Sequence, residues 1–259
     1  MSILLIDIGN TRVKWARLSG NRVGRARAAV HAQWNIQHYA REILQPAAPI
    51  ERVVVASVAD TRVVDVLNAA AARTRAPSPE FVKSERRGGG VVTAYTEPWR
   101  LGVDRFVSAI GAHHVAGATP VCVVSVGTAL TIDLVDAKGM HRGGCIVPGP
   151  SLMVDSLLTS TSGIRRRARG GADSGRSLFA RTTRTAIGQG ARYAAAAVVD
   201  RAVDEARTLL GRRPLVLLSG GAASQIKPLL RTPSRAVPDL VLIGLAVWAG
   251  VRVVPSGQK

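Results

Sequence analysis

The sequence predicts an α/β fold made of two duplicated halves, each a mixed sheet with flanking helices, with a cleft between the halves. Apolar period-2 runs alternate along the chain with helical patterns, as is typical of this class. The run LLIDIGNTRVK at 4–14 is also matched 118 residues later by CVVSVGTALTI at 122–132. Each run is an apolar strand followed by a small or acidic residue, any residue, a Gly and a small polar residue. This restart divides the chain into halves at 1–117 and 118–259, and ligands usually bind between such halves.

The first half begins with three strands that are expected to form an antiparallel meander. They occupy 2–7, 11–20 and 21–30, with a turn at Gly20–Asn21. Helical periodicity and short β-branched runs then alternate. They predict a helix over 35–44, a strand over 52–58, a helix over 62–73, a strand over 80–84 and a helix over 104–116.

The second half repeats this order. Strands are expected over 120–126, 129–136 and 139–150, again as a meander. The remaining elements are a long helix over 182–210, a strand over 214–222 that ends in a glycine pair, and a final helix over 240–254.

The composition indicates a soluble protein of the cytoplasm. The two cysteines, Cys122 and Cys145, have no metal-type spacing and suggest no disulfide framework, which fits a reducing compartment. The longest apolar stretch, near 240–251, is shorter than the ~20 residues that span a bilayer. Asp7 follows the start too closely for a signal peptide. We therefore expect a cytoplasmic location and no membrane contact.

The net charge of +18 would suit a nucleic-acid partner, but its distribution argues against one. The excess is mostly arginine spread along an alanine-rich chain, and aromatic residues make up 4%, too few for base-stacking platforms. The dense run Arg165–Arg169 adjoins GGADSGR at 170–176. This run predicts a mobile loop that is solvated or faces an anionic ligand, and no specific nucleic-acid partner is expected.

Glycine turns after the two matched strands predict a phosphate site. A Gly in a tight turn lets backbone N–H groups approach an anion, and Asn10, Thr11 and Thr128 add side-chain donors. Asp7, at the end of the strand, would hold a hydrated Mg²⁺ that bridges the phosphates, and Lys14 would reach the same charge. A plain hairpin with Asp7 on its rim is the alternative. The second turn and the SGG at 219–221 favour nucleotide binding, although the turns match neither a Walker loop nor a dinucleotide fingerprint.

Five segments carry a resemblance to a known family. They are DIGNTRVK at 7–14, AYTEPWRLGVDR at 94–105, VGTALTIDLVDAKGMHRGGCIVPGP at 126–150, TTRTAIGQG at 182–190 and LSGG at 218–221. In this order they resemble type III pantothenate kinases, members of the actin-like kinase superfamily, over nearly the whole chain. The GVDR and GTALTID blocks are quite specific, whereas DxGNT alone is less so. The resemblance implies actin-like, ribonuclease H-like domains.

The resemblance also implies an activity and its residues. The activity is ATP-dependent phosphorylation of pantothenate at its primary hydroxyl to 4'-phosphopantothenate, the first step of coenzyme A biosynthesis, by a homodimer. Asp104 matches the proton acceptor of the family. ATP binding is implied for Asp7, Ile8, Gly9, Asn10, Thr11, Arg12, Val13, Lys14 and Thr128. Pantothenate binding is implied for Tyr95, Gly102, Val103, Asp104, Arg105 and Thr183.

The residue types suit that chemistry, and each has a plainer interpretation. A carboxylate such as Asp104 can orient the attacking hydroxyl and take its proton, but it could instead be the N-cap of the following helix. The Arg105 guanidinium suits the pantothenate carboxylate, or could form a salt bridge with Asp104 or another acid. Tyr95 could line the substrate or be a half-buried core residue. Asp133 could support a metal or cap a turn.

Two other function classes remain open at this point. One is another actin-like phosphotransferase or phosphohydrolase, such as a polyphosphatase, which would use water as acceptor. The GVDR block after Tyr95 argues against a hydrolase, which needs no arginine for a substrate carboxylate. The other is a non-catalytic nucleotide-binding regulator.

Ser125 marks a departure from the family. Many relatives carry an Asp at this place, and that Asp is associated with a bound monovalent cation, K⁺ or NH₄⁺. A serine offers only a hydroxyl lone pair, so most of the local attraction for the cation is lost. We therefore expect the cation site at Ser125 to be weakened.

Overall fold

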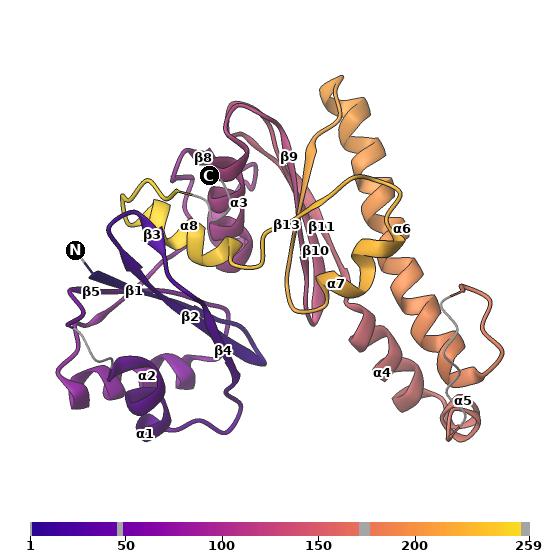
Figure 1. Ribbon diagram of the computed structural model, residues 1–259, viewed down its shortest axis with the longest axis horizontal. Helices are drawn as coiled ribbons and strands as arrows, with labels where there is room; N and C mark the ends of the chain where they lie inside the picture. The colour runs from indigo at the N-terminus through magenta and orange to yellow at the C-terminus, as the bar shows by residue number, and fades with distance from the viewer. Residues whose placement is uncertain (1, 46–48, 171–176, 255–259) are drawn as a thin grey trace. The chain divides into compact units, whose positions relative to one another are not determined.

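The structure is a computed structural model that describes residues 2–45, 49–170 and 177–254. The chain forms two compact units (Figure 1). The first unit comprises the residues up to Ala118, the short segment Gly139–His141 and the C-terminal residues from Asp239 onward. The second comprises Thr119–Lys138 and Arg142–Pro238. The division expected from the sequence, at 117–118, differs because it placed both returning segments in the second half.

The first unit is built on a mixed sheet. Strands β1 (Ser2–Ile8) and β2 (Arg12–Ser19) form an antiparallel hairpin, and β5 (Arg52–Ser57) and β6 (Pro79–Phe81) continue the sheet in parallel from β1. The expected third strand of the meander is split into β3 (Arg22–Val23) and β4 (Arg27–Val30), which both pair with β2. The sheet order is β3-β2-β1-β5-β6, with β4 on β2.

Helices cover both faces of this sheet (Figure 1). On one face, α1 (Ile36–Tyr39), the π-helical turn Ala40–Leu44 and α2 (Thr61–Thr74) pack on apolar side chains of β1, β2 and β5. On the other face lie α3 (Val103–Ala116) and α8 (Leu240–Trp248). Successive side chains of a strand alternate between faces, so the core residues Ile6 and Ile8 point toward α1, whereas Asp7 points toward α3 and α8.

Helices α3 and α8 cross with their backbones in close contact. A Cβ on Gly244 would lie 1.9 Å from the carbonyl oxygen of Val107, and one on Gly111 would lie 2.4 Å from that of Leu240. Only glycine fits at these two positions. The close packing holds α8 against α3. Because α8 also contacts β1, both helices have a fixed position relative to this strand.

The second unit repeats the sheet topology of the first. Strands β9 (Val121–Val126), β10 (Ala129–Val135) and β11 (His141–Pro148) form the meander, and β12 (Leu215–Ser219) and β13 (Arg235–Ala236) continue in parallel. The order is β11-β10-β9-β12-β13. This match to the first sheet confirms that the restart in the sequence marks a repeated mixed sheet.

The long helix α6 (Thr183–Leu210) packs on the apolar face of the second sheet (Figure 1). The side chains Ala195, Val199 and Val203 lie in one buried cluster with Val124 and Leu218 of the strands. The remaining helices of this unit are α4 (Pro150–Ser160), α5 (Ser162–Arg167), α7 (Ala223–Ile226) and the 3₁₀ turn Lys227–Leu229.

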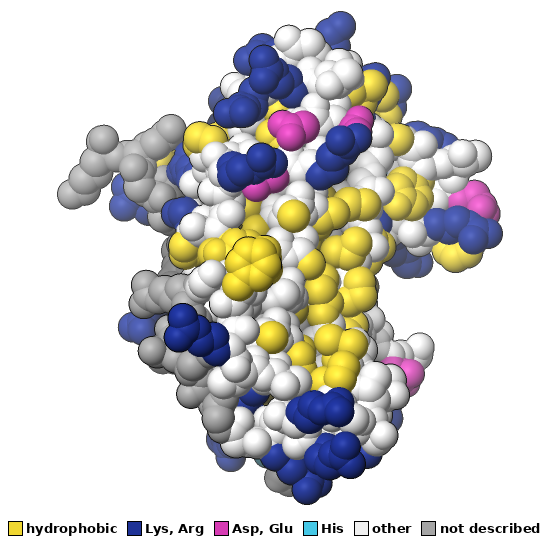
Figure 2. Space-filling model, turned by 90° about the vertical axis from the view of Figure 1, so that its right-hand side faces the viewer, with side chains coloured by type: hydrophobic (Ala, Val, Ile, Leu, Met, Phe, Trp, Pro, Cys, Tyr) yellow, Lys and Arg dark blue, Asp and Glu magenta, His cyan; other side chains and the backbone are white. Residues whose placement is uncertain are grey.

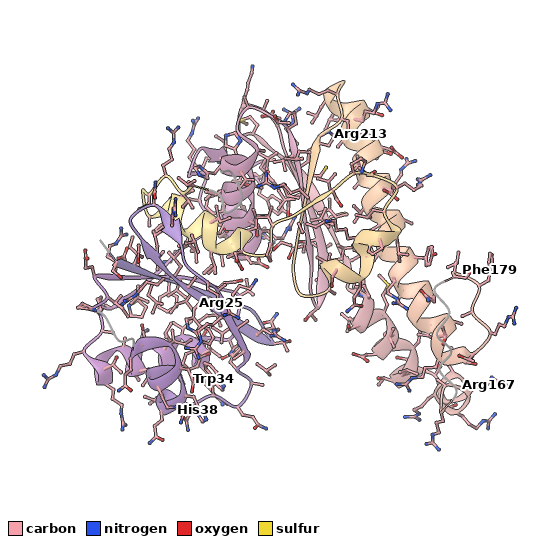
Figure 3. The ribbon with its side chains drawn as sticks, viewed as in Figure 1. Arg25, Trp34, His38, Arg167, Phe179 and Arg213 are labelled. Carbon is pink, nitrogen blue, oxygen red and sulfur yellow. The ribbon has the colours of Figure 1, made fainter. Side chains whose placement is uncertain are left out.

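Two local predictions need correction. The arginine run expected as a loop begins in α5, which extends to Arg167, and the segment 171–176 beside it lies outside the described residues. The arginine side chains of this run are exposed, as Arg167 is in Figure 3, whereas Ala168 is buried. The final helix ends at Trp248 rather than 254, because Gly250 takes a left-handed φ of +88°. The smaller elements 3₁₀ Pro98–Arg100, β7 (Arg87–Gly88) and β8 (Val91–Val92) were not expected.

None of the helices in the described ranges is long and apolar enough to cross a membrane.

Candidate functional site

The turn between β1 and β2 presents polar groups to solvent. The amide of Gly9 donates to the carbonyl oxygen of Arg12 at 2.9 Å, which closes the turn, and Asn10, Thr11 and Arg12 are exposed. By contrast, Ile8 and Val13 are fully buried in the core. Within the predicted ATP-binding segment, these two residues can therefore reach a ligand only through their backbone.

Asp7 has the electrostatics of a cation site. It is half-buried at the end of β1, and within the described part of the chain its carboxylate accepts no hydrogen bond. Burial, reinforced by the negative charge of Asp104 and opposed by Lys14, raises the pKa of Asp7 from 3.8 to about 7. Lys14 is the direct cross-strand neighbour of Asp7. A divalent cation here would offset both the burial and the repulsion between the two carboxylates.

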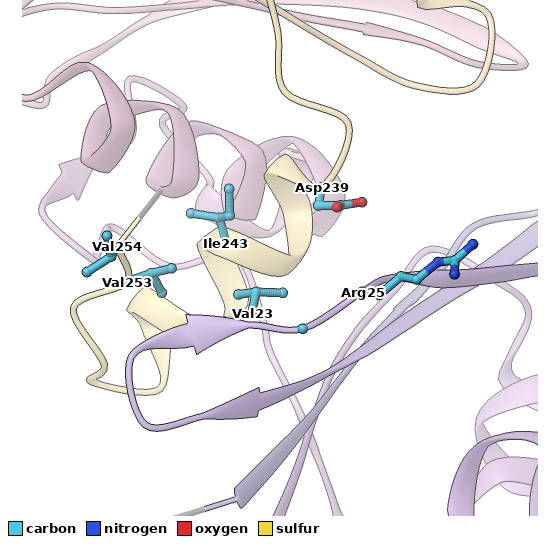
Figure 4. A pocket seen from close by; sticks show the side chains of 7 residues that line it. Val23, Arg25, Asp239, Ile243, Val253 and Val254 are labelled. Carbon is cyan, nitrogen blue, oxygen red and sulfur yellow. The ribbon is translucent and has the colours of Figure 1, made fainter. Parts of the chain in front are cut away.

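Asp239 joins this group, although the sequence analysis did not single it out. It lies just before α8, and its Oδ1 is 3.4 Å from Nζ of Lys14. The signal in the sequence was weak, because an Asp before an apolar helix is usually read only as a cap. Asp239 also lines a small pocket with Arg25 and Ile243 (Figure 4). The α8 start therefore adds the carboxylate of Asp239 to that of Asp7 in the surroundings of Lys14.

The start of α3 places Asp104 and Arg105. The N-cap is Gly102, so the interpretation of Asp104 as the N-cap is wrong. Asp104 lies in the first turn, half-exposed, and its Oδ1 accepts from the backbone N–H of Arg105 at 2.9 Å. A Cβ on Gly102 would lie 2.7 Å from that oxygen, so the glycine makes room for the carboxylate. Val103 is the first helical residue and is half-buried.

Arg105 and Tyr95 form a second polar pair in the first unit. Arg105 is 6% exposed, and its Nη1 donates to the Tyr95 hydroxyl at 3.0 Å, with the guanidinium 5.8 Å from the centre of the Tyr95 ring. The Tyr95 ring also lies 5.9 Å from that of His141. Tyr95 is half-buried but belongs to a polar contact rather than to the apolar core.

Arg86, which the sequence analysis missed, holds the loop that carries Tyr95. Its Nη1 donates to the carbonyl oxygens of Thr93 and Tyr95, at 3.3 and 2.8 Å, and its Nη2 to that of Thr96 at 2.8 Å. One guanidinium thus fixes three carbonyls of a four-residue stretch. An arginine nine residues before Tyr95 carries no local pattern that would reveal this role.

In the second unit, the turn after β9 is enclosed by glycines. Gly127 and Thr128 are exposed, and the carbonyl oxygen of Thr128 accepts from the amide of Gly149 at 2.8 Å. A Cβ on Gly149 would lie 2.1 Å from the Gly127 carbonyl oxygen. On the other side, Gly220 has φ +92°, and a Cβ there would lie 2.4 Å from the carbonyl oxygen of Val126. The SGG segment and the start of α4 thus both meet this turn.

Ser125 lies in a row of hydroxyl groups across the second sheet. It pairs with Thr131 on β10 and with Ser219 on β12, so the three side chains share one face of the sheet. Asp133, two residues beyond Thr131, is on the same face and is 2% exposed. Asp133 lies within β10 rather than at a turn, so its interpretation as a turn cap is wrong. Thr183 is the first residue of α6, behind the N-cap Thr182.

The predicted residues therefore form two groups. The first unit brings Asp7, Lys14, Asp104, Arg105 and Tyr95 to one side of its sheet, and the second holds Thr128, Ser125 and Thr183. Among the described residues, no three His, Cys, Asp or Glu side chains gather closely enough to hold a metal ion by themselves. This donor set suits Mg²⁺, which usually keeps several waters and binds through one or two carboxylates and substrate phosphates.

Comparisons with known proteins bear on the chemistry of these groups. The sequence model of one protein family, described as type III pantothenate kinase, matches residues 3–205. A type III pantothenate kinase of Nitrosococcus oceani is 36% identical over 248 residues, covering 94% of this chain and 92% of the relative. One from Xanthomonas campestris pv. campestris is 38% identical over 256 residues, covering 98% and 100%.

Two solved structures share the fold at low sequence identity. The activator of the 2-hydroxyisocaproyl-CoA dehydratase from Clostridium difficile, solved with bound ADPNP, gives a TM-score of 0.53 at 13% identity and covers 96% of this chain and 94% of that one. Component A of the Acidaminococcus fermentans (R)-2-hydroxyglutaryl-CoA dehydratase gives 0.54 at 12% identity, covering 97% and 98%. These likenesses confirm the predicted actin-like α/β fold with two mixed sheets.

Proposed function

The chain belongs to the type III pantothenate kinase family and phosphorylates pantothenate with ATP in coenzyme A biosynthesis, and from this premise we propose roles for its residues. Asp104 accepts the proton of the attacking pantothenate hydroxyl. The observation that supports this role most is that the negative charge of Asp104 raises the pKa of Asp7, since charges have this effect only at short range. A carboxylate within hydrogen-bond distance of an alcohol is a competent base for phosphoryl transfer.

The β1–β2 turn, from Asp7 to Lys14, binds the ATP phosphates in this proposal, together with Thr128. The exposed donors of the turn suit a polyphosphate, and Lys14 brings a positive charge. Asp7 would hold a hydrated Mg²⁺. When bound, this ion would neutralise the charge that develops on the transferred phosphoryl group.

Pantothenate is bound by Tyr95, Gly102, Val103, Asp104 and Arg105, with Thr183 as a further contact. The buried guanidinium of Arg105 would pair with the substrate carboxylate. The Tyr95 hydroxyl, which accepts a hydrogen bond from this guanidinium, would help to orient the guanidinium. Gly102, which has no Cβ, lets the Asp104 carboxylate take its place at the start of the helix.

Substitution of Arg105 by Lys tests the substrate side of this proposal. The charge stays, but the planar fork is lost, so we expect KM for pantothenate to rise about tenfold or more and KM for ATP to stay within about twofold. ATP consumption is measured on addition of pantothenate, with β-alanine and pantoate as controls. Lys in place of the exposed Arg73 of α2 is the matched control. An equal loss of affinity for both substrates would place Arg105 in the fold or at the phosphates instead.

Because Ser125 stands where many relatives carry an Asp, we propose that the monovalent-cation site is weakened in this protein. The surrounding hydroxyls of Thr131 and Ser219 carry no formal charge, and the Ser219 hydroxyl already donates to the carbonyl oxygen of Pro238 at 3.3 Å. We expect only weak activation by K⁺ or NH₄⁺, measured against a bulky organic cation at constant ionic strength. Ser125→Asp is expected to increase it, whereas Ser19→Asp, at the exposed end of β2, is not. A sharp, saturable K⁺ requirement in the unmodified protein would contradict this expectation.

The proposal includes a homodimer in the cytoplasm. Large apolar side chains are exposed on the second unit, among them Ile146 on β11, Leu152 and Leu157 on α4, and Phe179, which is 88% exposed. Figure 2 shows hydrophobic side chains gathered in the middle of one face, with lysine and arginine toward its ends. Such exposure is unusual for a monomer and supports a partner surface. ATP, the phosphoryl donor, is itself a cytoplasmic metabolite.

A further inference from the structure

A buried histidine contacts the β1–β2 turn, and a buried tyrosine contacts that histidine. His31, just after β4, is 4% exposed, and Tyr39, at the end of α1, is 1% exposed. Nε2 of His31 lies 2.8 Å from the carbonyl oxygen of Gly9, and Nδ1 lies 2.9 Å from the Tyr39 hydroxyl. Neither residue matched a ligand or catalytic pattern in the sequence.

The partners of His31 determine where its ring proton lies. A carbonyl oxygen can only accept, so Nε2 must carry a hydrogen and donate it to Gly9. In the neutral ring Nδ1 is then an acceptor, and the Tyr39 hydroxyl donates to it. Tyr39 therefore holds His31 in the tautomer that binds the turn. The Tyr39 ring is itself held by Trp34, whose ring centre is 5.2 Å away and which Figure 3 labels.

His31 holds the turn at a second point. Its backbone N–H donates to the carbonyl oxygen of Thr11 at 3.3 Å, and Gly9 donates to that of Arg12 at 2.9 Å. Three carbonyls of the turn are thus occupied by protein donors, two of them by His31. Because C=O and N–H point in opposite directions across a trans peptide, fixing the Gly9 carbonyl on His31 directs the Asn10 N–H away from it. Asn10 is exposed on that outer side.

We infer that His31, held by Tyr39, is a positioning residue that preorganises the β1–β2 turn with the Asn10 amide directed toward the ATP phosphates. The inference rests on the proposed ATP role of this turn. An anion-binding turn is most effective when its peptide dipoles need no reorganisation on binding. Without the Gly9–His31 bond, the Gly9–Asn10 peptide can rotate and present its carbonyl oxygen to the phosphates.

The test measures the affinity for Mg²⁺-ATP by calorimetry in variants of the two residues. Tyr39→Phe keeps the ring and removes only the hydroxyl, so we expect Kd to rise about threefold to tenfold, the effect of one lost hydrogen bond. We expect His31→Leu to weaken binding at least as much. His31→Gln should lose less, since its amide can still donate to Gly9. KM for pantothenate should stay within about twofold in all three.

Two controls separate positioning from general stability. Ile43→Val removes one methylene from the apolar cluster that contains Tyr39 and leaves His31 unchanged. It should lower Tm but leave the affinity for ATP unchanged. In the ¹⁵N spectrum, the His31 ring of the unmodified protein should show the Nε2–H form, and Tyr39→Phe should mix both tautomers.

The outcomes are distinguishable. Unchanged ATP affinity in Tyr39→Phe and His31→Leu, together with weakened affinity in Lys14→Met, would overturn the positioning role and leave the ATP site in place. Unchanged affinity in Lys14→Met as well would overturn both, because the turn would then not bind ATP. An equal loss in Ile43→Val would reduce His31 and Tyr39 to ordinary core residues.

Discussion

Substitution of Asp104 by Asn is expected to reduce pantothenate-dependent turnover by about 10²–10⁴-fold, the usual cost of losing a general base. The amide oxygen can still accept from the Arg105 N–H, so the first turn of α3 should remain intact. KM for ATP and the thermal midpoint should therefore stay close to those of the unmodified protein. Steady-state kinetics and a thermal melt check the three quantities on one preparation.

Asp60 offers a matched control for this experiment. It also lies at a helix start, where its Oδ1 accepts from the Arg62 N–H at 2.8 Å, but it caps α2 rather than α3. Asp60→Asn should keep full turnover. If Asp104→Asn also does so, the carboxylate of Asp104 serves only the first turn of its helix and the base must be sought elsewhere.

Substitution of Asp7 by Asn is expected to stabilise the ligand-free protein and to inactivate it. The pKa of Asp7 is raised from 3.8 in an exposed carboxyl to about 7 in the folded chain. The folded state therefore holds the proton more tightly than the unfolded state, and the free energy of unfolding falls as the pH rises from about 4 to 7. Above pH 7 the full penalty is present, on the order of 2–4 kcal/mol for a half-buried group.

Asn carries no charge and escapes this penalty. At pH 8 the variant should melt about 3 °C or more above the unmodified protein, and the difference should vanish near pH 4. Mg²⁺-ATP should raise the Tm of the unmodified protein more than that of the variant, and turnover should fall by roughly 10²-fold or more.

The exposed Asp65 of α2 is the control for Asp7, because Asp65→Asn should change neither Tm nor its pH dependence. A variant at Asp7 that melts lower than the unmodified protein at pH 8 would show that the carboxylate is already compensated in the ligand-free chain. The proposed cation site would then lose its electrostatic basis.

The sequence alone was sufficient for the architecture and the family. The restart of LLIDIGNTRVK as CVVSVGTALTI predicted two sheets of one topology, and strand order β11-β10-β9-β12-β13 repeats that of the first sheet. This succeeded because strand alternation and glycine turns are local signals, written in adjacent residues. The motifs around Asp7 and Asp104 could be recognised for the same reason, because each lies within one short segment of the chain.

Only the tertiary structure showed which residues from other parts of the chain contact those motifs. Asp239 meets Lys14 across 225 positions of the chain, because α8 returns to the first unit and packs on α3 through Gly111 and Gly244. His31 reaches Gly9 because β4 pairs with β2 beside the turn. Contacts of this kind depend on how helices and strands pack, so they cannot be predicted from the spacing of residues along the chain. The raised pKa of Asp7 follows from the same packing, because it arises from burial and from the charge of Asp104.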